Sequence, residues 1–272
     1  MPNKNTIEDI SRSEGDSRVL AHYPAPACHK KHNTKKMKIK ANIREVQSEK
    51  NPNFRGYATL TIGDMVIKDV AVSNVPSKTK EGETFIGFSL PQRTYQVKNE
   101  ETGVEETKYS PIVEIKSEKE EDTKKLVSSI RKTLSETFSQ EPNEYGFKEK
   151  ENEVDIPYDP SKVTAYATPR TSEKNENLRA FANVYVGNVV RINDMAVTEG
   201  TAKDGTKFLS TNMPQRSYQD KEGVKKWEDQ VFPTSKDLRV AINDKVKESY
   251  DYAMNRENEK TEEAKEPEGE EL

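Results

Sequence analysis

The sequence lacks most of the features by which common functional classes are recognised. It has one cysteine in 272 residues, which excludes an intrachain disulfide and favours a reducing compartment. No stretch approaches the roughly 18 consecutive apolar residues of a membrane span. Residues 1–18 also lack the apolar segment of a secretory signal. We therefore expect a soluble cytoplasmic protein with no membrane partner.

Residues that enzymes use for acid–base or phosphate chemistry are also scarce. There is no phosphate-binding loop of the Walker type and no G-x-G-x-x-G motif. The three histidines lie close to the one cysteine, as His22, Cys28, His29 and His32. Thiolate and imidazole can bind zinc, but zinc motifs show two paired spacings, so we interpret this stretch as a basic arm. The sequence therefore predicts no enzyme activity and no cofactor.

The chain is polar, and its charge is unevenly distributed. Apolar residues make up 31% and charged residues 34%, which is too polar for one large globule. Residues 30–40 hold six lysines and no acid, whereas residues 256–272 hold eight glutamates against three basic residues. This composition predicts a disordered basic arm at 1–35 and a disordered acidic tail at 256–272.

A six-residue motif occurs twice between the basic arm and the acidic tail. "LPQRTY" occupies residues 90–95, and "MPQRSY" occupies residues 213–218. Upstream of each phrase, residues 56–72 and 180–197 show an alternating apolar run, a Gly-Asp or Gly-Asn pair and a second apolar run. That pattern is typical of a hairpin with a two-residue turn. The chain therefore carries one module twice.

Each copy ends in a predicted helix. Leu126, Ile130, Leu134 and Phe138 recur every four residues in the first copy, as do Leu238, Ile242, Val246 and Tyr250 in the second. Strands precede the helix, which favours an antiparallel sheet. We predict an α+β fold of two tandem small domains, each a mostly antiparallel sheet with a C-terminal helix. Domain 1 spans 36–139, a charged linker spans 140–161, and domain 2 spans 162–255.

Several pieces of the second copy follow the pattern of a known family. They are Asp194-Met195-Ala196-Val197, Phe208-Leu209, Met213-Pro214-Gln215-Arg216, Phe232-Pro233 and the helix from Leu238. The first copy has Asp69-Val70-Ala71-Val72, Phe85-Ile86, Leu90-Pro91-Gln92-Arg93 and Ser110-Pro111-Ile112. With these elements the chain resembles the SpoVG family, the bacterial stage V sporulation protein G or septation regulator.

The resemblance implies a fold, partners and a site. Family members are small homodimeric α+β proteins that bind DNA and in some cases RNA, with basic residues around the Met-Pro-x-Arg loop. A tandem chain is then expected to pair its two copies intramolecularly or to form a homodimer, and to act as a regulator that contacts phosphate. The candidate nucleic-acid-binding residues are Arg93, Arg216, Lys78, Lys80, Lys203, Lys207, Tyr95 and Tyr218.

Other interpretations of the same residues stay open. The arginines suit bidentate phosphate contacts, but they equally suit pairing with carboxylates of the twin copy. The tyrosines, together with Trp227, suit base stacking or the capping of a sheet edge. The alternative function is a protein–protein adaptor whose acidic tail competes with nucleic acid.

Overall fold

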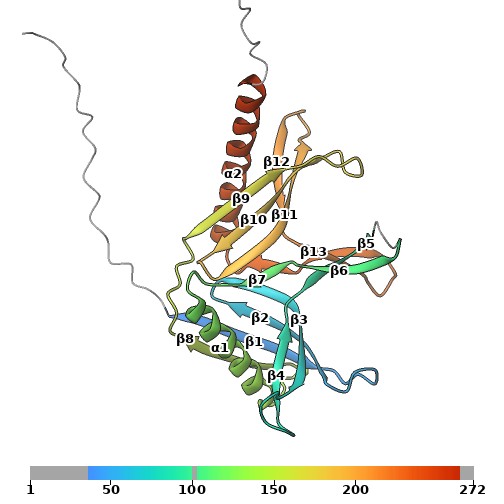
Figure 1. The fold of residues 1–272 in the computed structure, drawn as a ribbon, viewed down its shortest axis with the longest axis vertical. Coiled ribbons are helices and arrows are strands. Elements are labelled where there is room, and N and C mark those ends of the chain that lie inside the picture. The colour runs from blue at the N-terminus through green and yellow to red at the C-terminus, as the bar shows by residue number, and fades with distance from the viewer. Residues whose placement is uncertain (1–35, 100–102, 264–272) are drawn as a thin grey trace, which may run out of the picture. The chain divides into compact units, whose positions relative to one another are not determined.

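The structure is a computed structural model that describes residues 36–99 and 103–263, with side chains up to Glu257 (Figure 1). The predicted basic arm at 1–35, including Cys28, His29 and His32, lies outside the described residues. In chain order the elements are β1 (Met37–Glu45), β2 (Phe54–Ile62), β3 (Met65–Pro76), β4 (Thr84–Ser89), β5 (Gln92–Lys98), β6 (Glu105–Pro111), β7 (Val113–Ile115), α1 (Glu120–Phe138), β8 (Lys148–Val154), β9 (Val163–Pro169), β10 (Leu178–Val186), β11 (Val190–Thr201), β12 (Lys207–Asn212), β13 (Gln215–Gln219), β14 (Lys225–Asp229), β15 (Val231–Pro233) and α2 (Lys236–Glu263).

These strands form two larger sheets and two separate hairpins. The first sheet has the order β15-β3-β2-β1-β8, with β4 also paired to β3. The second has the order β12-β11-β10-β9, with β7 also paired to β11. The β5–β6 hairpin and the β13–β14 hairpin each stand alone as two-stranded sheets, and we call them the first arm and the second arm. Every pairing is antiparallel.

The predicted fold class is wrong, because the copies are not two tandem α+β domains that each close on their own helix. The described chain is mostly antiparallel strand in several sheets, with two helices. Strand β7 belongs to the first copy but pairs with β11 of the second, with Ile192 opposite Val113. Strand β15 of the second copy pairs in the same way with β3 of the first, with Val231 opposite Ile67. Each main sheet therefore contains a strand of the other copy.

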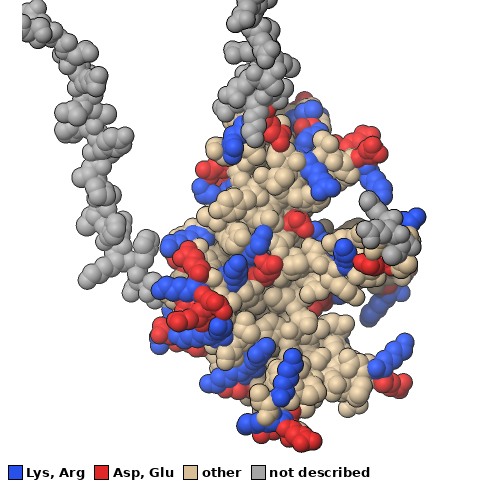
Figure 2. Space-filling model, viewed as in Figure 1, with Lys and Arg blue, Asp and Glu red and all other residues tan. Residues whose placement is uncertain are grey.

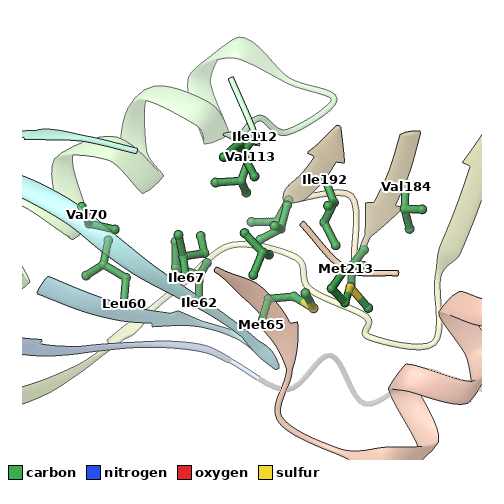
Figure 3. Close-up of a cluster of buried hydrophobic side chains, with 14 of the residues drawn as sticks. Leu60, Ile62, Met65, Ile67, Val70, Ile112, Val113, Val184, Ile192 and Met213 are labelled. Carbon is green, nitrogen blue, oxygen red and sulfur yellow. The ribbon is translucent and has the colours of Figure 1, made fainter. Parts of the chain in front are cut away.

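The exchanged strands place the apolar faces of both copies in one core. Leu60, Ile62 and Ile67 of the first copy belong to the same buried cluster as Val184 and Ile192 of the second (Figure 3). The hairpin faces expected to be apolar are confirmed as buried: Ala58, Leu60, Ile62, Ala182, Val184 and Val186. Leu126, Ile130 and Leu134 of α1 are fully buried too, which confirms the four-residue spacing of that helix.

The segment predicted as a linker, 140–161, forms part of the fold. It contains β8, which pairs with the outer edge of β1. Its glutamates face lysines of β1, with Nζ–carboxylate distances of 2.7 Å for Lys38–Glu151 and 2.9 Å for Lys40–Glu149. The alternation of Lys and Glu in β8 looks like a solvated connection in the sequence. In the structure it is a charged edge strand, a common device against unwanted strand pairing.

Tyr158 follows β8 and joins the two copies at their hairpin turns. A β-carbon placed on Gly63 or on Gly187 would overlap its ring, so the ring lies between the β2–β3 turn and the β10–β11 turn. Both glycines have positive φ, as the turns require. The Tyr158 hydroxyl accepts a hydrogen bond from the Asp64 N–H at 2.9 Å. Burial raises the pKa of this phenol well above its ordinary range.

The beginning of the predicted acidic tail is helical, because α2 continues to Glu263. Nothing in the described part of the chain is a helix apolar and long enough to cross a bilayer.

Candidate functional site

One aspartate in each copy occupies a bulge of the central hairpin: Asp69 in the first copy and Asp194 in the second. Asp69 and Asp194 have φ of 58° and 53°, a left-handed conformation that Asp tolerates better than most residues. The register of β2–β3 shifts between Ala58 and Leu60, and that of β10–β11 shifts between Ala182 and Val184. β3 and β11 therefore each contain one extra residue, and the bulge turns the aspartate side chain away from the direction that regular strand alternation would give it.

Each of these aspartates binds the arginine of the other copy. Arg93 donates from Nη1 to Asp194 Oδ2 at 3.3 Å and from Nη2 to the Asp194 carbonyl at 3.2 Å. Arg216 lies reciprocally, with its Nε 3.0 Å from Asp69 Oδ2. We call these two contacts the crossed ion pairs. Both arginine side chains stay partly exposed, at 40% and 45%, so a ligand can still reach them.

Glu228 of the second arm makes a further contact between the copies, and the first arm has no glutamate at the equivalent position. Its carboxylate accepts from Arg216 Nη2 at 3.1 Å within the second arm. It also pairs with Lys68 of β3, which belongs to the first copy. The hydrogen bond from Lys68 is the main cause that lowers the pKa of Glu228, and the hydrogen bond from Arg216 lowers it further. The equivalent place in the first arm is Ser110, opposite Arg93, so the two arms are anchored unequally.

The arms repeat one arrangement of side chains. Residues directly opposite in an antiparallel pair share a face, as do residues two apart along a strand. Tyr95 lies opposite Lys108 in the first arm, and Tyr218 lies opposite Lys226 in the second. One face of each arm therefore presents an arginine, a tyrosine and a lysine: Arg93, Tyr95 and Lys108, and Arg216, Tyr218 and Lys226. Both tyrosines are exposed, at 49% and 42%.

The other face of each arm carries a second exposed aromatic residue. Tyr109 lies opposite Thr94, and Trp227 lies opposite Ser217. Lys225 Nζ sits 4.9 Å from the centre of the Trp227 ring, a cation–π contact. Tyr109, Lys108 and Lys226 did not stand out in the sequence. The hairpin register was the signal that could have found them, because it places each one beside a residue of the repeated phrase.

The four candidate lysines lie away from the arm of their own copy. Lys78 and Lys80 are in the β3–β4 loop, and Lys203 is in the β11–β12 loop that leads into Lys207 at the start of β12. These lysines lie at or before the N-terminal ends of β4 and β12, whereas the first arm follows the C-terminal end of β4 and the second arm follows the C-terminal end of β12. Lys80 pairs with Glu83 at 3.3 Å, and Lys207 pairs with Glu199 at 2.8 Å. The structure thus brings the arginine and tyrosine of each copy together but not these lysines.

On the face shown in Figure 2, charges of both signs alternate rather than forming one basic patch. Lysine and arginine side chains are interspersed with carboxylates across the face shown in Figure 2. Lys226, on the second arm, pairs with Asp220 at 2.7 Å, and this contact lowers the pKa of Asp220. Within residues 36–99 and 103–263, no group of three or more potential metal-ligating side chains forms a site. The arms are therefore close to neutral, with aromatic rings as their most prominent feature.

Comparison with known proteins gives no assignment: no protein-family model, no curated protein and no solved structure matches this chain.

Proposed function

We propose that this chain is a non-enzymatic regulatory protein of the SpoVG type that binds single-stranded DNA or RNA with its two arms in the cytoplasm. The observation that carries the proposal is the repeated Arg–Tyr–Lys face, Arg93, Tyr95 and Lys108 with Arg216, Tyr218 and Lys226. Bases stack on exposed aromatic rings while nearby cations follow the phosphates, which is how sequence-tolerant single-strand binding works. The resemblance to SpoVG proteins supports the same partner.

The crossed ion pairs alter the role expected for the arginines. A guanidinium that is already bound to a carboxylate of the other copy offers less net charge to a phosphate. Arg93 and Arg216 therefore chiefly orient the arms, and the tyrosines supply most of the binding free energy. Stacking contributes about 1–3 kcal/mol per base in proteins that use it.

Fluorescence anisotropy with labelled 20-nucleotide single strands of DNA and RNA tests the proposal. The double variant Tyr95→Ala/Tyr218→Ala should weaken binding by about tenfold or more, because it removes one stacking ring from each arm. Tyr145→Ala is the matched control, because Tyr145 is an exposed tyrosine in the loop before β8 and belongs to neither arm. Binding that is absent at low salt, or unchanged in the double variant, would overturn the proposal.

The salt dependence of the same binding tests how much of it is electrostatic. Arg93, Lys108, Arg216 and Lys226 can neutralise at most four phosphates, so the slope of log K against log salt should be no steeper than about −3. A much steeper slope would locate the contact on another, more basic surface.

A second candidate, a protein–protein adaptor, is favoured by the balance of charge on the arms. The pairs Arg216–Glu228 and Lys226–Asp220 leave little net positive charge on the second arm. A chain without residues 264–272 separates the two functions. Tighter binding of a single strand by the shortened chain would show that the acidic tail competes for the arms. A stable protein partner, with no nucleic-acid binding at low salt, would favour the adaptor.

A further inference from the structure

A groove of about 490 Å³ lies beside the second arm, and residues of both copies line it. This volume falls within the ~300–1,000 Å³ typical of small-molecule sites. Phe181 of β10 and Ala196 of β11, which are register partners, are among the lining residues. Trp227 of the second arm and Arg93 of the first arm line it as well. The groove thus combines two aromatic rings with a guanidinium.

Side-chain amides supply the polar lining. Asn175, Asn212 and Gln215 all face the groove. Asn212 donates from Nδ2 to Thr198 Oγ1 at 3.2 Å, and Gln215 donates from Nε2 to Asp229 Oδ1 at 2.7 Å. These bonds fix the orientation of the two amides. A carboxamide offers a donor beside an acceptor, which matches the edge of a nucleobase, and an aromatic ring matches its face.

The crossed ion pair of Arg93 completes the chemistry of the groove. A guanidinium has five N–H donors, and the contacts to Asp194 use two nitrogens on one side of it. Asp194 itself lines the groove, and its carboxylate can accept from the exocyclic amine of a base. A phosphate contact by Arg93 and an amine contact by Asp194 are therefore compatible in one ligand.

We infer that this groove binds one unstacked nucleobase of the strand held by the arms, with the adjoining phosphate against Arg93. The base stacks on Trp227, and the carboxamide of Asn212 contacts its edge. This inference rests on the proposed function and adds to it a defined subsite. The equivalent positions in the first copy hold Tyr109 for Trp227, Tyr57 for Phe181 and Ser89 for Asn212. The loss of the carboxamide there makes the second copy the preferred site for a base.

The fluorescence of Trp227 reports on the subsite directly, because the chain contains one tryptophan. Titration with an unlabelled 20-nucleotide single strand should quench this fluorescence and protect it from acrylamide, with the same midpoint as the anisotropy titration. Anisotropy that saturates with no change in Trp227 fluorescence would leave strand binding in place and refute the subsite.

Two matched variants test the assigned contacts. Asn212→Ser installs the residue of the first copy and should weaken strand binding about fivefold or more, because it removes a base-edge contact. Ser89→Ala, at the equivalent position of the first copy, should change the affinity less than twofold. Equal effects of the two substitutions would contradict a base contact at Asn212.

A separate titration distinguishes failure of the subsite from failure of strand binding. If no single strand binds, Trp227 fluorescence is followed during addition of each of the common nucleoside monophosphates. If a mononucleotide quenches Trp227, and the Asn212→Ser variant binds that mononucleotide more weakly, the subsite is supported. The arms are then rejected as a strand-binding surface. Absence of quenching by strands and mononucleotides alike would reject both.

Discussion

At the residue scale, the aspartates of the crossed ion pairs have two separate roles. Asp194 supplies a charge to Arg93, and it also occupies a left-handed bulge position that costs most L-residues about 1 kcal/mol or more. These roles can be separated, because Asn tolerates the same conformation while lacking the charge.

We therefore expect Asp194→Ala to destabilise the protein by about 1 kcal/mol more than Asp194→Asn does. The measurement is urea unfolding of both variants against the wild type. The same pair of changes at Asp69 should give the same order, since Asp69 occupies the equivalent bulge. Equal losses for Asn and Ala would contradict the importance of the left-handed backbone.

Glu228 should make stability depend on pH in the acid range. Its pKa is lowered in the folded state by Lys68 and Arg216, so its contribution is fully present above its ordinary value of about 4.3. The contribution is lost as the pH falls below that value and through the lowered pKa of the folded protein. The difference in urea midpoint between the wild type and Glu228→Gln should therefore shrink over this window. A difference that stayed constant from pH 7 down to pH 2 would show that the carboxylate contributes no charge-dependent stability.

Loss of Tyr158 should destabilise the fold, because its ring lies between the two hairpin turns. Tyr158→Phe leaves the Asp64 N–H without its partner and should cost about 1 kcal/mol. Tyr158→Ala also empties the space between the two glycine turns and should cost about 3 kcal/mol or more. Thermal unfolding of both variants checks the order. A loss in Tyr158→Ala no larger than that in Tyr158→Phe would mean that the ring packing is unimportant.

At the element scale, β8 protects the open edge of β1 through paired charges. Replacing Glu149, Glu151 and Glu153 by lysine places like charges opposite the lysines of β1 and should loosen the strand. Hydrogen exchange should then become faster for the β1 amides that donate to β8. Adding Lys36→Glu, Lys38→Glu and Lys40→Glu to the same chain should restore protection. Exchange that is unchanged in the triple-lysine chain would show that the charges do not hold β8 in place.

The elements themselves were predictable where the sequence is periodic. Alternation identified the buried face of β2 and β10, and the four-residue spacing identified the buried face of α1. The sequence also indicates short strands within 108–115 and 229–235, where β7 and β15 lie, but the same rules could not tell which strands these two pair with. Each has three residues, and its partner lies on the other copy, far away in sequence. Strand β8 was not predicted for a different reason: its Lys–Glu alternation has no apolar face that would distinguish a strand from a solvated linker.

At the scale of the whole molecule, the sequence revealed the repeat but not how the copies combine. Arg93 and Arg216 align in the repeated phrase, and their partners Asp69 and Asp194 were visible as aligned carboxylates. Which arginine meets which aspartate depends on the exchange of β7 and β15, which no local pattern encodes. The exchange also explains why arms from different copies contribute to one groove.

Scanning calorimetry of the wild type and of Val231→Asp tests most directly whether the two copies form one folded unit. Val231 of β15 is fully buried beside Ile67 of the other copy. One transition, with a calorimetric enthalpy equal to the van't Hoff enthalpy, is expected for the wild type. The substitution should lower the temperature of that whole transition. Two resolved transitions, with only one of them shifted by Val231→Asp, would show that each copy folds as a separate domain.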